Sequence, residues 1–92
     1  MIVRIATQGQ FKVEDSVVDK LNDIDNQIVD VVAAGDEAGF AALLSSLLNV
    51  VTSSGEAVAQ DELVASDLIL PSPDTTLEEA KQLFAGDGLI PD

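Results

Sequence analysis

The chain has 92 residues, of which 47% are hydrophobic, and a formal net charge of −13 at pH 7. This length fits one domain spanning residues 1–92, and the hydrophobic content is too high for a disordered chain. Because the negative charge would repel phosphate backbones and anionic lipid headgroups, we expect no direct binding to nucleic acid or to a membrane surface.

The first predicted element is a β-hairpin. Ile2–Ala6 and Phe11–Val13 are rich in the β-branched and aromatic residues that are typical of short strands. Gly9, in the segment between them, supplies a backbone that can adopt a positive φ and therefore a tight turn. We expect these two strands to pair in antiparallel fashion at the N-terminus.

An amphipathic helix follows the hairpin. Apolar residues recur at steps of three and four from Val17 to about Ala34, which is the spacing of one helix face. Asp15 or Ser16 can cap the first turn, since both residue types accept hydrogen bonds from backbone N–H groups. Gly35 suits the position just after the helix end.

A second helix is predicted from Asp36 to Gly55. Its large apolar residues fill one arc of the helical wheel. The opposite arc contains only small, uncharged residues, namely Ala38, Ala41, Ala42, Ser45, Ser46, Asn49, Thr52 and Ser53. The short link between the two helices makes them antiparallel neighbours, a helical hairpin.

The last third of the chain is predicted to contain short elements. Glu56–Gln60 fits a loop or a short strand, and Leu68–Leu70 fits a short third strand that ends before Pro71. The sequence allows this strand either to pair with the hairpin or only to cover the core.

A C-terminal helix is predicted next, because a Thr followed three residues later by a Glu forms a capping box. The candidate pairs are Thr75 or Thr76 with Glu78 or Glu79, and the helix should run to about Ala85 with Leu77, Ala80, Leu83 and Phe84 facing inward. We expect Leu89 and Ile90 to pack back on the core. The resulting fold class is α+β, with an N-terminal β-hairpin, an antiparallel helical hairpin, a short third strand and a C-terminal helix.

Catalysis has little support in the residue types present. The chain has no His and no Cys, so it lacks the most common general base, the best thiol nucleophile and any disulfide. No glycine-rich phosphate-binding loop is present. We therefore predict that the chain is not an enzyme and has no catalytic residues, no bound cofactor, and no zinc or copper site.

The distribution of charge is unusual. Between Leu21 and Ala80 there are twelve Asp and Glu residues and no Lys or Arg. These acidic residues repel one another, and dissolved salt weakens that repulsion. The excess of acids therefore favours adaptation to a salty cell over the alternative of a basic partner. A divalent-ion site remains an alternative function, since Asp61, Glu62 and Asp67, or Asp74 with Glu78 and Glu79, could supply oxygen ligands.

The small, uncharged face of the second helix is the best candidate for an interaction. Small residues allow another helix to approach closely, and uncharged ones cost little to desolvate. Asp25 is a further candidate because it falls inside the apolar arc of the first helix. The predicted partner-binding residues are Asp25, Ala38, Ala42, Ser45, Ser46, Asn49 and Ser53.

Several alternatives stay open for these residues. The second helix could be buried on both sides within the domain, it could dock on a helical partner, or it could form a structural homodimer. Asp25 is either a carboxylate at the edge of the arc that reaches solvent or a charge that meets a basic residue of a partner.

The chain resembles the PspAA family in three segments: IVRIATQGQFKVEDS at the start, GEAVAQDELVASDLILPSPDTTLEEAKQLF in the middle and GDGLIPD at the end. PspAA is the small protein associated with phage shock protein A in archaea and actinobacteria. The residues that carry the resemblance best are Gly9, Gln10, Phe11, Asp61, Glu62, Leu63, Val64, Ser66, Asp67, Leu68, Gly88, Leu89, Ile90 and Pro91. None of them forms a catalytic signature.

The resemblance implies a non-catalytic, protein-binding accessory module of the envelope-stress response. The implied partner is the long helical coiled coil of phage shock protein A. Since neither a signal peptide nor a membrane-spanning stretch is visible, we expect a cytoplasmic protein that reaches the membrane only through this partner. The family's second helix carries Arg, so its uncharged face here reflects either haloadaptation or an interface particular to this chain.

Overall fold

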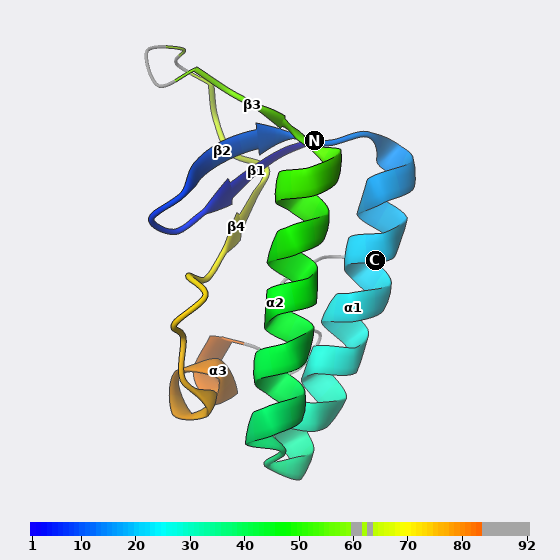
Figure 1. The fold of residues 1–92 in the computed structure, drawn as a ribbon, viewed down its shortest axis with the longest axis vertical. Helices are drawn as coiled ribbons and strands as arrows, with labels where there is room; N and C mark the ends of the chain where they lie inside the picture. The colour runs from blue at the N-terminus through cyan, green and yellow to red at the C-terminus, as the bar shows by residue number, and fades with distance from the viewer. Residues whose placement is uncertain (60–61, 63, 84–92) are drawn as a thin grey trace.

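The computed structural model of the chain describes residues 1–59, 62 and 64–83. Two long antiparallel helices lie beside a small sheet, and a short helix follows the last strand (Figure 1). The elements are β1 (Ile2–Ile5), β2 (Gly9–Lys12), α1 (Asp15–Ala34), α2 (Glu37–Ser54), β3 (Glu56–Ala57), β4 (Leu68–Leu70) and α3 (Leu77–Leu83). The predicted α+β class, both hairpins, the short strand and the C-terminal helix are all confirmed.

The sheet has the strand order β3-β2-β1-β4. β1 pairs with β2, and β2 with β3, in antiparallel fashion, whereas β4 lies parallel to β1. In this register Val3 is opposite Phe11 on one side and Leu68 on the other. β4, the short strand predicted at Leu68–Leu70, therefore pairs with the hairpin. The two-residue β3 adds a further strand, in a segment that the sequence predicts to be either a loop or a short strand.

Two residues at the connection of β1 and β2 have positive φ: Thr7 in the turn and Gly9 at the start of β2. Gly9 has φ 98°, as the sequence predicts, and the Gln8 N–H donates to the Ile5 carbonyl at 2.9 Å. Thr7 also has φ 73°, which sequence reasoning did not anticipate. A β-branched residue in this region is strained, because its side chain crowds the backbone.

The start of α1 differs from the prediction. Neither Asp15 nor Ser16 occupies the N-cap position, which belongs to Glu14, and the Glu14 side chain makes no cap hydrogen bond. The helix begins earlier because the N–H groups of Val17 and Val18 already donate to the Glu14 carbonyl. The end is as predicted, since Gly35 adopts a left-handed conformation with φ 73°.

The predicted start of the second helix and the predicted capping box of the C-terminal helix are confirmed. The Asp36 carboxylate accepts a hydrogen bond from the Gly39 N–H at 2.9 Å at the start of α2. A capping box opens α3, where the Thr76 N–H donates to Glu79 Oε1 and the Glu79 N–H donates to Thr76 Oγ1, both at 3.2 Å. Ala80 of α3 is buried as predicted. Leu77 is half-buried against the core, also as predicted. The expectations for Phe84, Leu89 and Ile90, and for the side chain of Leu83, fall outside what the structure describes.

The core lies between the sheet and the helical hairpin. Alternate strand residues point toward the helices, so Val3, Ile5, Leu68 and Leu70 are buried together with apolar side chains of α1 and α2. The intervening residues Arg4 and Ile69 are exposed. One face of the sheet therefore packs against the helices, and the opposite face meets solvent at these positions. In the described part of the chain, no helix is long and apolar enough to cross a membrane.

Candidate interaction surfaces

The small, uncharged face of α2 is exposed along its whole length. We call it the α2 surface; it consists of Ala38, Ala41, Ala42, Ser45, Ser46, Asn49, Thr52 and Ser53, each of which is exposed. The opposite face of α2 is buried through Phe40, Leu44, Leu47, Leu48 and Val51. The alternative in which this helix is buried on both sides within the domain is therefore wrong.

Polar groups on the α2 surface bind one another. The Ser53 hydroxyl donates to Asn49 Oδ1 at 3.2 Å, and the Thr52 hydroxyl donates to the Asn49 carbonyl at 3.3 Å. These local bonds satisfy part of the hydrogen-bonding capacity that would be lost when water leaves the surface. The surface can therefore be covered by a partner at a lower cost than free polar groups would impose.

Asp25 does not belong to the α2 surface. It lies on α1 on the same side as the buried residues Leu21, Ile28 and Val32, and its exposed fraction is 0%. The interpretation of Asp25 as an arc-edge carboxylate that reaches solvent is wrong, because the arc in which it falls faces the interior. In this conformation the side chain offers no surface for a partner to contact.

Residues of the family motifs meet on the sheet, although they are far apart in the sequence. Gln10 on β2 donates through Nε2 to the Val64 carbonyl at 3.0 Å and to Ser66 Oγ at 2.8 Å. Asp67 accepts through Oδ2 from the Ile2 N–H at 2.8 Å. These bonds fasten the connection that leads from β3 to β4, so this part of the motif has a structural role.

The other motif residues have separate roles or fall outside the described part. Gly9 begins β2 directly after the hairpin turn, Phe11 packs against the core, and Leu68 is buried in the core. Glu62 is exposed. Asp61, Leu63, Gly88, Leu89, Ile90 and Pro91 lie outside the described residues. Sequence reasoning missed the contacts of Gln10 because more than fifty positions separate it from Val64 and Ser66.

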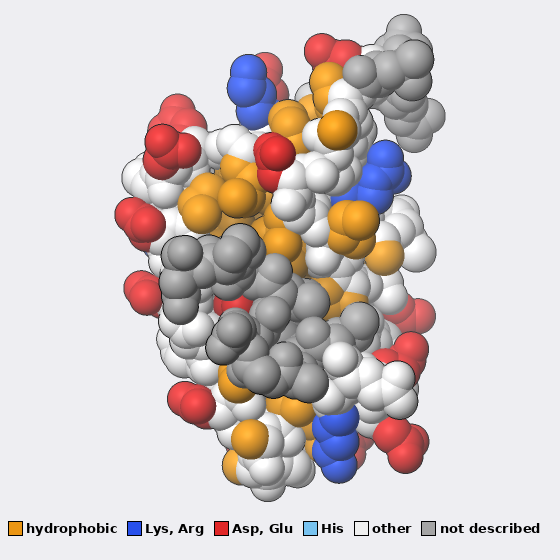
Figure 2. All heavy atoms as spheres, turned by 180° about the vertical axis from the view of Figure 1, so that it is seen from behind, with side chains coloured by type: hydrophobic (Ala, Val, Ile, Leu, Met, Phe, Trp, Pro, Cys, Tyr) orange, Lys and Arg blue, Asp and Glu red, His pale blue; other side chains and the backbone are white. Residues whose placement is uncertain are grey.

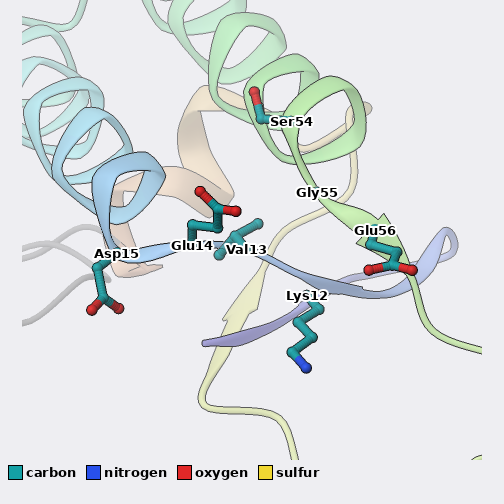
Figure 3. A pocket seen from close by; sticks show the side chains of 7 residues that line it. All are labelled: Lys12, Val13, Glu14, Asp15, Ser54, Gly55 and Glu56. Atoms are coloured by element: carbon teal, nitrogen blue, oxygen red, sulfur yellow. The ribbon is translucent and has the colours of Figure 1, made fainter.

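A crevice of about 490 Å³ lies where β2 leads into α1 and α2 leads into β3 (Figure 3). Lys12 and Glu56 are opposite each other in the β2–β3 register, and the Asp15 side chain points away from the end of α2. Ser54 is the one hydroxyl side chain in the lining, and no residue beside it is a His or Cys that would activate it.

The acidic clusters do not converge in the described part of the chain. No group of three or more potential ligands lies close enough together there to hold a metal ion. Asp67 is already engaged with the Ile2 N–H, and Asp61 falls outside the described residues. Asp74 is fully exposed, and the hydrogen bond from the Ser72 hydroxyl, at 2.5 Å, lowers the pKa of its carboxyl below the usual value.

Comparison with known proteins matches the chain to a protein family. The model of the PspAA family, described as PspA-Associated protein, matches residues 1–92, which is the whole chain. No curated protein and no solved structure matches. The chain belongs to the PspAA family.

Proposed function

We propose that this protein is a non-catalytic accessory module that binds a helix of phage shock protein A through its α2 surface. The family description supports association with phage shock protein A. That partner, as a coiled coil, offers long helices on which another helix can pack. Through this partner the protein would take part in the response to envelope stress.

The observation that carries the proposal is the absence of charge on an exposed helix face. The chain has a net charge of −13, yet none of the eight exposed residues of the α2 surface is ionisable. An exposed helix normally carries charged residues on its solvent side. Small side chains let a second helix approach closely, and uncharged ones avoid the cost of burying a charge.

Binding to phage shock protein A tests the proposal. The partner encoded in the same genome is titrated into this protein by calorimetry in about 1 M NaCl, where the Debye length is near 3 Å and net repulsion is screened. The double variant Ala42→Lys/Ser46→Lys places two charges in the contact. Burial of uncompensated charge costs about 3–5 kcal/mol, so we expect binding to weaken by more than about a hundredfold.

A matched double variant on the other helix controls for added charge. Asn26→Lys/Ala33→Lys changes one polar residue and one alanine at exposed positions of α1. It should bind phage shock protein A as the unmodified chain does. If both double variants bind equally well, the α2 surface is not the contact.

The same surface could instead form a structural homodimer. Sedimentation distinguishes the two assemblies, because a homodimer forms without phage shock protein A and the Ala42→Lys/Ser46→Lys variant would dissociate it. The accessory role is supported if the protein sediments as a monomer at high salt and forms a complex only after phage shock protein A is added.

A further inference from the structure

The outer face of the sheet, which points away from the helices, carries a different set of side chains from the α2 surface. The register places Arg4 opposite Gln10 on β2 and opposite Ile69 on β4. It also places Ile2 opposite Lys12. Because neighbouring residues alternate between the two faces, these five side chains share the outer face, and we call them the sheet surface.

The sheet surface is where large hydrophobic side chains meet solvent. Ile69 is 62% exposed and Val64 is 37% exposed, and they are the exposed large hydrophobic residues of the described chain. Gln10 holds the Val64 carbonyl, so Val64 lies beside the sheet surface. The upper part of Figure 2 shows hydrophobic side chains between two basic groups, with an acidic group among them.

Arg4 is the distinctive charge on this surface. The chain has four basic residues in all, and two of them, Arg4 and Lys12, are on the sheet surface. Lys12 is opposite Glu56 on β3, so its charge has a nearby counterpart. The register places no carboxylate opposite Arg4, since its neighbours there are Gln10 and Ile69. Arg4 therefore presents its guanidinium to solvent next to an exposed aliphatic side chain.

We propose that the sheet surface is a second docking site, for a partner protein segment that presents a carboxylate to Arg4 and an aliphatic side chain to Ile69. A guanidinium can hold a carboxylate through two parallel hydrogen bonds. Neighbouring strands are about 4.8 Å apart, which is close to the spacing of side chains one turn apart on a helix. An amphipathic helix with Glu and Leu separated by one turn fits both groups.

Space for the segment exists beside Arg4. A hollow of about 450 Å³ is bounded by Arg4, Gln10 and residues 57–59. The hollow lies on the β2–β3 side of Arg4, whereas Ile69 lies on the other side, on β4. It can therefore take a further apolar side chain of the segment, in addition to the one that meets Ile69. At high salt, the repulsion between the net charge of this protein and a distant acidic group is largely screened. The attraction between Arg4 and a carboxylate in direct contact is screened less, because the two groups are closer than the Debye length.

A protein segment fits the sheet surface better than an anionic membrane or a second copy of this chain does. An anionic membrane would meet the whole net charge of −13 over a wide area, whereas a single carboxylate meets only Arg4. A second copy of this chain would bring the same net charge and a second Arg4. The sheet surface and the α2 surface share no residue, so one partner on each surface would use different contacts.

The test uses a short helical peptide of Leu and Glu spaced one turn apart, added to the isotope-labelled protein in about 1 M NaCl and followed by NMR. The amide signals of Arg4, Gln10 and Ile69 should shift, and those of the α2 surface should not. Arg4→Gln and Ile69→Ser should each weaken binding by about fivefold to tenfold, and Arg4→Lys should restore part of it. Lys20→Gln, which removes an exposed positive charge from α1, is the matched control and should bind normally.

Three results would overturn the proposal. One is the absence of shifts, or shifts confined to the α2 surface. Another is equal binding of a peptide in which Lys replaces Glu. The third is a preference for anionic phosphatidylglycerol vesicles, or self-association that Arg4→Gln abolishes. None of these results depends on phage shock protein A, so the docking site and the proposed function can fail independently.

Discussion

At the scale of single residues, Gly55 shows a constraint that its sequence context does not reveal. A Cβ on this residue would lie 2.5 Å from the Val51 carbonyl oxygen, 3.1 Å from Val13 Cγ1 and 3.2 Å from Phe11 Cβ. Its φ of −87° is open to any residue. The sequence marks Gly55 only as a helix end, whereas the structure shows that the last turn of α2 itself, through the Val51 carbonyl, and the hairpin side chains leave no room for a side chain.

Replacement of Gly55 by Ala should therefore destabilise the fold. The methyl group forces the carbonyl of Val51 or the neighbouring strand to move, and such overpacking costs about 1–3 kcal/mol. Chemical denaturation measures the free energy of unfolding. Ser54→Ala, at the exposed position before it, should change this free energy by less than about 0.5 kcal/mol. Equal stability of the two variants would show that the close approach is not as described.

Asp25 is a second residue whose environment the sequence does not specify. Its place in the apolar arc of α1 is visible in the sequence, but the arc alone allows either an exposed or a buried carboxylate. The structure buries it completely. Only the position of the other elements around α1 decides between the two.

At the scale of elements, the helices were the most predictable parts. Their signals are local: the spacing of apolar residues, Gly35 after α1, and cap bonds that span three positions at Asp36 and between Thr76 and Glu79. The start of α1 was predicted incorrectly, because two acceptor side chains were available and the backbone used neither of them. Sheet partners were less predictable, since β1 and β4 are joined by contacts across most of the chain.

Loss of the Gln10 contacts should loosen the connection between β3 and β4. Gln10→Ala removes two hydrogen bonds, each worth about 0.5–1.5 kcal/mol, so we expect a loss of about 1–3 kcal/mol in the free energy of unfolding. Limited proteolysis should become faster in the connection. Gln8→Ala, in the turn of the same hairpin, serves as the control and should leave both measurements unchanged. Faster cleavage in both variants would contradict the anchoring role.

At the scale of the whole molecule, charge is the dominant property. The carboxylates greatly outnumber the basic groups, and the twelve between Leu21 and Ala80 have no Lys or Arg among them in the sequence. Mutual repulsion among them opposes the compact state, and dissolved salt weakens it. The same charge makes the neutral α2 surface and the exposed Arg4 distinctive.

The free energy of unfolding should therefore rise between about 0.05 M and about 2 M NaCl, as the Debye length shortens. Neutralising three exposed acids of α1, in the triple variant Asp19→Asn/Asp23→Asn/Asp30→Asn, should reduce this salt dependence. The corresponding triple change to Glu keeps the charge and should retain it. Equal stability of the unmodified chain at both salt concentrations would contradict adaptation to salt.

The sequence by itself determined the α+β class, both hairpins, the capping box of α3 and the existence of a helix face without charge. These features depend on residues that are close together in the chain. The tertiary structure decided that β4 lies parallel to β1, that Gln10 meets Val64 and Ser66, and that Asp25 is buried while the α2 surface is exposed. Each of these depends on which element covers another, and a local pattern of residues does not specify that.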